Sequence, residues 1–382
     1  MKFIQKSLSY ILVAALASAL TLFLNTPKVD KLDQLLNLAD QLYVEDVDLD
    51  KLRDAAAQGI ISALGDRWSF YISADEMADY QEQMKNAYVG VGIELLVQND
   101  ASDFKIMAVT AGGPAEKAGL KVGDILMKVN GQLCAELGVN GTTALIRGEA
   151  GTTVELTVLR DGQELTFTVK RQYFEVPVAS SQMLQGNVGL VTIKNFDGRC
   201  ALETKAAIEV LLTQGAKAII FDVRNNGGGY KDEMVQVLDY LLPEGKLFVS
   251  KDHTGKEQVD MSDEACLDIP MAVLVNENSY SAAELFAAAL QEYDAATVVG
   301  QKTSGKGYYQ ITYELVDGSA VALSVGTYCT PNGVSLEGVG ITPDIPVEVD
   351  EEIAEKIYFG QLSPREDPQL QAALQALLPS VA

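Results

Sequence analysis

The stretch from Val275 to Gln310 reads VNENSYSAAELFAAALQEYDAATVVGQKTSGKGYYQ and decides how the chain folds. It overlaps the apolar, β-branched run PMAVLVNE at 270–277, which is typical of a strand buried on both faces. SAAELFAAALQEY then has the composition and the apolar spacing of a helix. Ser281 therefore stands where a buried strand gives way to a helix. In α/β proteins ligands bind at this edge of the sheet, where the helix N-terminus presents unpaired N–H groups.

Two interpretations of Ser281 follow from its neighbours. Ser281 and Glu284 form a Ser-x-x-Glu capping box, and most such pairs only begin a helix. Downstream, Lys306 lies between two glycines in TSGKG, where the backbone can pack tightly while the side chain enters a pocket. A lysine in an apolar pocket can serve as a general base and activate a serine hydroxyl. A catalytic Ser281/Lys306 pair thus competes with the ordinary alternative of a helix cap and a lysine in a turn.

Two other site chemistries fit this region less well. The spacing of Gly300, Gly305 and Lys306 is similar to the sequence pattern of a phosphate-binding loop. However, Gly307 stands where that pattern has the Ser or Thr that binds magnesium, and a strand-like run follows. A Ser-His-Asp triad needs a histidine, and the single one, His253, lies in a polar, turn-like stretch. The four cysteines show no Cys-x-x-Cys spacing, which excludes a zinc ribbon or a disulfide scaffold. We expect no cofactor and no metal.

A second junction between a strand and a helix carries a glycine-rich loop. Residues 218–223 are apolar and strand-like, residues 225–229 read NNGGG, and residues 231–242 have a helical pattern. The N–H groups of such a loop can form an oxyanion hole. A glycine-rich turn without a chemical task is an equal alternative for the loop taken alone.

Together these motifs resemble the carboxyl-terminal processing peptidases, also called tail-specific proteases. The resemblance rests on FDVRNNGGG, VNENSYSAAE, TSGKGYYQ and GVGITPDIPV in this order, and it extends from about residue 42 almost to the C-terminus. It implies that Ser281 is the nucleophile, Lys306 the base and Gln310 the residue that orients the lysine. The family's usual Ser-Ala-Ser-Ala-Ser-Glu run reads SYSAAE here, which alters local packing and retains the nucleophile. N–H groups of Ala282 and Gly228 would then bind the oxyanion.

A further unit, at residues 88–171, resembles a PDZ domain. GGPAEKAGLKVGDILMKVNG is its most specific part, and two alternating strand patterns meet at Asp161-Gly162, which is a hairpin signal. PDZ domains add an extended peptide to a sheet edge and hold its terminal carboxylate in backbone N–H groups. The resemblance assigns this carboxylate to the loop formed by Gly90, Val91, Gly92 and Ile93.

The predicted fold class is multidomain α+β. We predict a signal anchor or signal peptide at 1–26, an N-terminal helical region at 27–86, a β-sandwich-like PDZ domain at 87–172, a serine peptidase core at 173–350 and a helical tail at 351–382. The resemblance assigns the core to a crotonase-like or Clp-protease-like α/β fold. Lys2 and Lys6 before an apolar run at 8–24 favour an uncleaved anchor, and Ala17-Ser18-Ala19 offers the alternative of a cleavage site.

The expected function is an extracytoplasmic, bacterial serine endopeptidase, anchored to the cell membrane or secreted after cleavage of the N-terminal segment. It would recognise the free, apolar C-termini of loosely folded proteins through the PDZ domain, and a homodimer is a further expectation. The formal net charge of −24 argues against nucleic acid as a partner. The alternative is a PDZ-type adaptor on an inactive or partner-gated protease scaffold, although Ser281 and Lys306 are both present.

Overall fold

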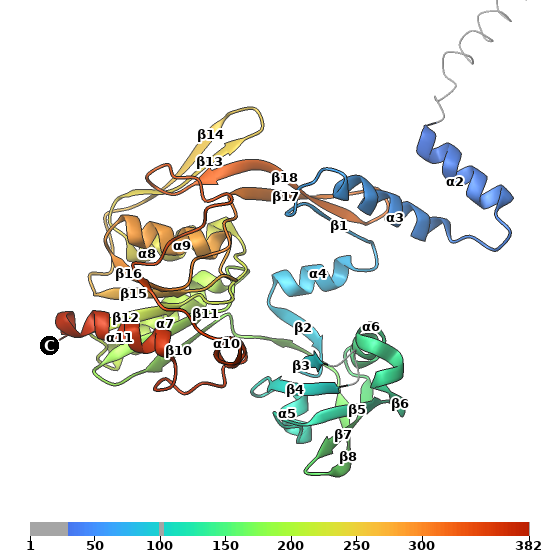
Figure 1. The fold of residues 1–382 in the computed structure, drawn as a ribbon, viewed down its shortest axis with the longest axis horizontal. Coiled ribbons are helices and arrows are strands. Elements are labelled where there is room, and N and C mark those ends of the chain that lie inside the picture. The colour runs from blue at the N-terminus through green and yellow to red at the C-terminus, as the bar shows by residue number, and fades with distance from the viewer. Residues whose placement is uncertain (1–29, 99–102, 382) are drawn as a thin grey trace, which may run out of the picture. The chain divides into compact units, whose positions relative to one another are not determined.

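The computed structural model describes residues 30–98 and 103–381. The chain divides into two compact units, Met1–Ser73 and Ala74–Ala382. Figure 1 shows helices in the first unit, and helices together with sheets in the second. The predicted multidomain α+β class is confirmed, whereas the boundaries of the five predicted segments stay predictions.

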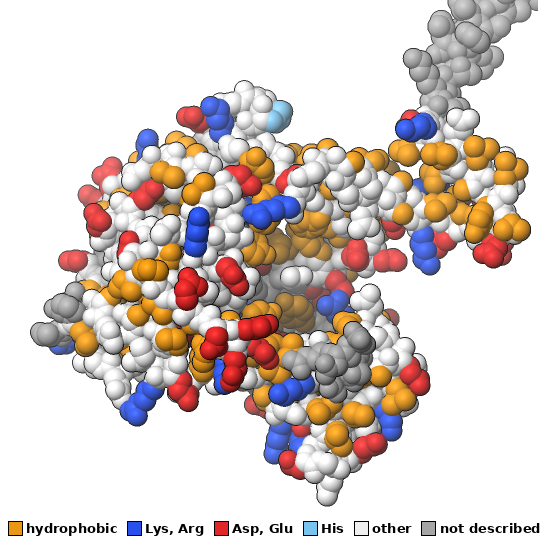
Figure 2. Space-filling model, viewed as in Figure 1, with side chains coloured by type: hydrophobic (Ala, Val, Ile, Leu, Met, Phe, Trp, Pro, Cys, Tyr) orange, Lys and Arg blue, Asp and Glu red, His pale blue; other side chains and the backbone are white. Residues whose placement is uncertain are grey.

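The first unit contains the helices α2 (Lys31–Leu42) and α3 (Leu49–Ser62) and the short strand β1 (Phe70–Ile72). Asp48 caps α3 because its carboxylate accepts the N–H groups of Asp50 and Lys51. Neither helix contains a buried residue. Figure 2 shows hydrophobic side chains over α2, where four leucines are exposed: Leu32, Leu35, Leu38 and Leu42.

The predicted signal anchor at residues 1–26 lies outside the described residues. Within residues 30–98 and 103–381, no helix has the length and apolar character needed to cross a membrane. The anchor therefore stays a prediction from the sequence.

The second unit is built on a sheet of order β10-β11-β12-β15-β16-β19. Its strands span Ala179–Met183, Val188–Ile193, Ala218–Asp222, Met271–Val275, Ala296–Gly300 and Ile345–Pro346. All neighbours run parallel except β10, which pairs with β11 in the antiparallel direction. Every residue of β15 is buried, as the apolar run predicts for a strand covered on both faces.

Helices cover both faces of this sheet, because alternate side chains of its strands enter two different cores. One core joins Phe221 and Val273 to α7 (Cys200–Thr213), α8 (Lys231–Leu241) and α9 (Ala282–Glu292). The other joins Ile220 and Leu274 to α11 (Pro368–Val381). Figure 1 shows α8 and α9 on one side of the sheet and α11 on the other.

An antiparallel sheet lies in the same unit, with the pairing order β17-β18-β13-β14. Its strands span Tyr308–Glu314, Ala320–Cys329, Gly245–Asp252 and Glu257–Ser262. The loop that carries Lys306 leads directly into β17. Because a strand follows Lys306, the structure agrees with the sequence argument against a phosphate-binding loop.

The PDZ-like part has strands in the order β3-β4-β5-β7-β8, with β6 beside β5. These strands span Ile93–Gln98, Asp103–Val109, Ile125–Val129, Thr153–Arg160 and Gln163–Lys170, with β6 at Gln132–Leu133 and the helices α5 and α6 at Pro114–Ala118 and Cys134–Ile146. Asp161 and Gly162 both have positive φ, at 52° and 77°, between the paired residues Arg160 and Gln163. The predicted hairpin is therefore confirmed.

Shorter elements complete the second unit. Strand β2 (Ala87–Gly90) pairs with β9 (Gln172–Glu175) where the chain enters and leaves the PDZ-like part. Helix α4 (Met77–Met84) precedes β2, and α10 (Glu351–Tyr358) follows β19, the last strand of the mostly parallel sheet.

Candidate active site

Ser281 lies at the predicted junction, after β15 and at the N-cap of α9. Its φ of 61° and ψ of −125° are values that residues with a side chain rarely adopt. The surrounding structure holds this turn, because the Tyr280 N–H donates to the Asn226 carbonyl oxygen at 3.1 Å. The position of Ser281 between a buried strand and a helix is confirmed.

The Glu284 carboxylate connects this junction to the Lys306 loop. Its Oε2 accepts the N–H groups of Ser281 at 3.1 Å and of Lys306 at 2.9 Å. Its Oε1 accepts the Gly305 N–H at 2.7 Å and the Thr303 hydroxyl at 2.5 Å. Glu284 is fully buried, which raises the pKa of its carboxyl, and the four hydrogen bonds oppose this rise. The capping box is therefore real, and the same carboxylate also joins two loops.

The two glycines around Lys306 permit close backbone packing. A Cβ atom at Gly305 would lie 3.0 Å from the amide nitrogens of Val339 and Gly340. A Cβ atom at Gly307 would lie 2.7 Å from the amide nitrogen of Glu337. The Lys306 backbone is thus fixed against the segment that reads EGVG, as the glycines predict.

Gln310 lies in β17, four residues after Lys306. Its side-chain amide donates to the Ser324 hydroxyl at 2.8 Å and to the Tyr308 carbonyl oxygen at 3.2 Å. These bonds fix the Gln310 side chain on the sheet of β17 and β18. Its role in orienting Lys306 stays a prediction.

The glycine-rich loop lies directly against Ser281. At Gly228, which has φ of 90°, a Cβ atom would lie 2.7 Å from Ser281 Cβ and 3.0 Å from the Ala282 nitrogen. The Gly228 N–H donates to Asn226 Oδ1 at 2.8 Å, and Asn226 is fully buried. The structure therefore brings Gly228 and Ala282 together at Ser281. It also gives the Gly228 N–H an acceptor within the protein, so its role in the oxyanion hole stays a prediction.

The predicted carboxylate loop connects β2 to β3 in the PDZ-like part. Gly90 ends β2, Val91 is buried, and Ile93 begins β3. Gly92 has φ of 78°, and a Cβ atom there would lie 3.1 Å from Thr110 Cβ. The loop thus needs its second glycine for backbone conformation and for space. Binding of a carboxylate by this loop stays a prediction.

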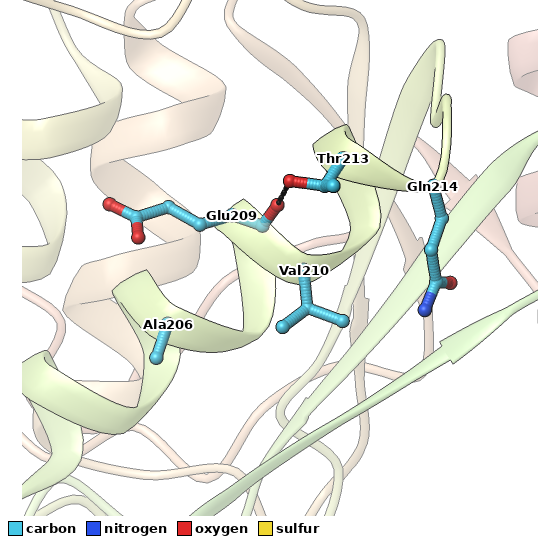
Figure 3. A pocket seen from close by; sticks show the side chains of 5 residues that line it. All are labelled: Ala206, Glu209, Val210, Thr213 and Gln214. Carbon is cyan, nitrogen blue, oxygen red and sulfur yellow. Dashed lines mark hydrogen bonds between the residues drawn. The ribbon is translucent and has the colours of Figure 1, made fainter.

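Two further surface features lie apart from these residues in the sequence. His253 is exposed in the turn between β13 and β14, and Figure 2 shows the pale blue histidine at the end of this hairpin. This agrees with a solvated loop histidine. Figure 3 shows a shallow pocket on α7 and the turn that follows it, and no predicted site residue is among its lining residues, Ala206, Glu209, Val210, Thr213 and Gln214.

Sequence reasoning missed two residues of this site. Glu284 was visible as a cap, but its bonds to the Lys306 loop depend on tertiary structure. Tyr328, in β18, donates its hydroxyl to the Lys306 carbonyl oxygen and is almost fully buried. No motif marks Tyr328, because it is a single aromatic residue in a strand made mostly of small and aliphatic residues.

Family models match the chain in three places. They are peptidase family S41 over residues 187–347, a PDZ domain over residues 105–160, and the N-terminal domain of the activating protease CtpB over residues 14–76. The first two matches fall within the serine peptidase core and the PDZ domain that the sequence predicts. The third covers the described helices of the first unit.

Two bacterial proteases are similar to the chain in sequence. The chain is 33% identical over 356 residues to the carboxy-terminal processing protease CtpA of Bacillus subtilis, and the match covers 89% of this chain and 76% of that protein. A CtpA-like serine protease of Staphylococcus aureus is 33% identical over 325 residues, with 84% of this chain and 65% of that protein covered. The chain thus spans about two thirds of the length of the staphylococcal relative.

Two solved structures are similar in fold. The photosystem II D1 C-terminal processing protease has a TM-score of 0.50 and 26% identity, with 83% of this chain and 92% of that chain covered. An S41 protease from Bacteroides fragilis has a TM-score of 0.60 at 17% identity, with coverages of 90% and 96%, and shows likeness of fold alone. In this chain a PDZ domain accompanies a peptidase domain, which implies protein or peptide substrates. Because the 33% identity extends over most of the Bacillus subtilis protein, this chain belongs to the carboxy-terminal processing proteases, which are serine-type peptidases of family S41.

Proposed function

We propose that the chain is an endopeptidase that cleaves with a Ser281/Lys306 dyad. The observation that carries this proposal is the shared acceptor, because one oxygen of Glu284 receives the N–H groups of both residues. A buried carboxylate therefore fixes the backbones of the two residues relative to each other. A serine at a helix N-terminus and a lysine held close to it are the groups that a Ser/Lys hydrolase requires.

The proposed reaction runs in two steps. Ser281 Oγ attacks the carbonyl carbon of the scissile peptide bond while Lys306 Nζ accepts the hydroxyl proton. The tetrahedral intermediate collapses, the C–N bond breaks, and the lysine ammonium gives its proton to the leaving amine. A water molecule then attacks the acyl ester with Lys306 as base, which releases the product and restores Ser281. Gln310 is the proposed orienting residue for Lys306.

The oxyanion would be stabilised at the start of α9. Ala282 is the first residue of this helix, and the positive end of the helix dipole favours negative charge there. Gly228 lies close enough to Ala282 to contribute a second donor. Its N–H group would first have to leave Asn226 Oδ1. A change in the glycine-rich loop on substrate binding is therefore part of the proposal.

Recognition of C-terminal tails is proposed for the PDZ domain. The loop of Gly90 to Ile93 would hold the terminal carboxylate, and an extended apolar tail would add to the sheet edge. The positive φ of Gly92 and the packing of Val91 in the domain core support this placement. A substrate whose terminal carboxylate is converted to an amide should then be cleaved more slowly than its free-acid counterpart.

The proposed location is outside the bacterial cytoplasm, with the N-terminal segment as an anchor or as a leader that is removed. The apolar run at 8–24 after Lys2 and Lys6 supports this. A homodimer is also proposed, since the exposed leucines of α2 offer an apolar surface to a second copy. Fractionation of cells that express the full chain, with added external protease, tests the location. Sedimentation of the purified chain tests the oligomeric state.

The proposed activity is tested with the full chain in mild detergent and an unstructured protein that ends in apolar residues. Wild type should cleave this protein, and Ser281→Ala should not. The amidated substrate should lower the cleavage rate without abolishing it. Cleavage by Ser281→Ala at the wild-type rate would contradict the proposed nucleophile.

A gated or inactive scaffold that acts as a PDZ adaptor is the second candidate. The hydrogen bond from the Gly228 N–H to Asn226 Oδ1 favours it, because an oxyanion hole needs that donor to point at the substrate. Binding of the tail without cleavage, by a chain that keeps Ser281 and Lys306, would support this second candidate over the first.

A further inference from the structure

Tyr328 holds the peptide units next to the proposed base. Its N–H donates to the Gly307 carbonyl oxygen at 2.9 Å, and its hydroxyl donates to the Lys306 carbonyl oxygen. The Lys306 N–H is held by Glu284, so both backbone polar groups of Lys306 have partners inside the protein. The Tyr328 ring is 3% exposed and stacks on Phe248 with the ring centres 5.6 Å apart. The hydroxyl therefore has a fixed position.

Burial of the Tyr328 phenol, and next the charge of Glu284, raise its pKa. A phenol carries one proton, and Tyr328 uses it in the hydrogen bond that its hydroxyl donates to the Lys306 carbonyl oxygen. A phenol that keeps its proton cannot act as a base, so Tyr328 acts on the Lys306 loop by position.

We propose that Tyr328 is a positioning residue of this site, which fixes the peptide unit of Lys306, and with it the start of the lysine side chain, through the hydrogen bond from its hydroxyl. The proposal rests on the proposed Ser281/Lys306 dyad. Tyr328 thus complements Glu284, which accepts the N–H group of Lys306 and also that of Ser281.

The first test is Tyr328→Phe in the full chain, which keeps the buried ring and removes the hydroxyl. We expect kcat to fall about 10- to 100-fold with KM within about twofold of wild type, because positioning is lost while substrate binding is kept. Tyr293→Phe is the matched control, because the Tyr293 hydroxyl donates to a backbone carbonyl, that of Lys246 in β13, at 2.9 Å. The control should keep wild-type kcat. A folded Tyr328→Phe protein with wild-type kcat would overturn the proposal.

A second test avoids loss of the hydroxyl altogether. Incorporation of 3,5-difluorotyrosine at position 328 keeps the shape of the side chain and makes its phenol more acidic. Once ionised, this phenol cannot donate to the Lys306 carbonyl, so the alkaline limb of the kcat profile should move to lower pH. The same substitution at position 293 should leave the profile unchanged. An unchanged pH profile with 3,5-difluorotyrosine at position 328 would contradict the proposal, because that result is expected if Tyr328 serves only to pack the core.

Ser281→Ala, measured in parallel, separates the two proposals. If Ser281→Ala is inactive while Tyr328→Phe is as active as wild type, the dyad stands and the role of Tyr328 is wrong. If Ser281→Ala cleaves as wild type does, the proposed function fails, and the role of Tyr328 fails with it.

Discussion

The N–H groups of Ser281 and Lys306 donate to the same oxygen atom, Glu284 Oε2, at 3.1 and 2.9 Å. The acceptor belongs to α9, the helix that Ser281 begins, whereas Lys306 belongs to the loop before β17. One buried carboxylate therefore fixes the position of the Lys306 loop relative to the start of α9. Each change to this carboxylate should act on both residues at once.

Glu284→Gln is expected to lower kcat/KM about 10- to 100-fold through lost positioning. Each carboxylate oxygen accepts two hydrogen bonds, so the new NH₂ group must face two donors in either orientation. The buried mismatch should also lower the free energy of unfolding by about 1–3 kcal/mol. Cleavage kinetics and thermal unfolding measure both effects. Glu277→Gln makes the same chemical change at an exposed position of the same segment and should leave both values unchanged.

Gly228→Ala is expected to displace the glycine-rich loop from Ser281 and to reduce cleavage strongly. The added Cβ atom would lie 2.7 Å from Ser281 Cβ, and the φ of 90° is unfavourable for alanine. Gly215→Ala is the matched control, because Gly215 has a φ of 91° and open space around its Cβ position. Both variants carry the backbone strain, so equal losses of activity would show that contact with Ser281 has no part in the effect.

Arg224→Ala should lower the free energy of unfolding by about 3–5 kcal/mol, since it leaves one buried and one largely buried carboxylate without their partner. Arg224 contacts Asp222 at 2.6 Å and Asp367 at 2.8 Å, which ties the end of β12 to the segment that begins α11. Chemical denaturation gives the measured value. Arg53→Ala removes an exposed pair with Asp50 and should cost less than about 1 kcal/mol. Similar losses of unfolding free energy for the two variants would contradict the expectation that the buried ion pairs matter more than the exposed one.

Asp197 should make stability depend on pH. Burial, and next the charge of Glu233, raise the pKa of Asp197 from 3.8 to about 7, and Asp197 Oδ1 has no hydrogen-bond partner in the described part of the chain. The folded protein therefore holds a proton that the unfolded chain releases at lower pH. Stability should fall as pH rises from about 4 through about 7, by up to about 4 kcal/mol.

Asp197→Asn removes this titration. Its unfolding free energy should match that of wild type near pH 3, below the unfolded pKa, and exceed it increasingly up to pH 8. Unfolding measured at several pH values between these limits checks the difference. Parallel curves for the two proteins would show that Asp197 is not the group responsible.

The positions of Ser281, Gly228 and Lys306 could be predicted because each depends on local sequence. Strands β12 and β15 are apolar runs of the expected length, and each is followed by a turn and a helix with clear periodicity. Glycines on both sides of Lys306 indicated close packing, and residues 337–340 provide it. The same local signals identified the PDZ hairpin at Asp161 and Gly162.

Other features could not be predicted because they depend on contacts between distant segments. The second task of Glu284 needs the Lys306 loop to fold back onto α9, and a capping pattern says nothing of that. Tyr328 reaches Lys306 from 22 positions away, with no motif around it. The acceptor of the Gly228 N–H is a side chain two residues earlier, and the rotamer of Asn226 decides it.

The central claim is that Lys306 is the base for Ser281, and one comparison tests it most directly. Cleavage of an unstructured protein with an apolar tail is measured for the full chain, for Lys306→Ala and for Lys302→Ala, an exposed lysine of the same loop. We predict that Lys302→Ala cleaves at the wild-type rate and that Lys306→Ala, folded as judged by its thermal unfolding, shows no cleavage. Wild-type cleavage by Lys306→Ala would contradict the account.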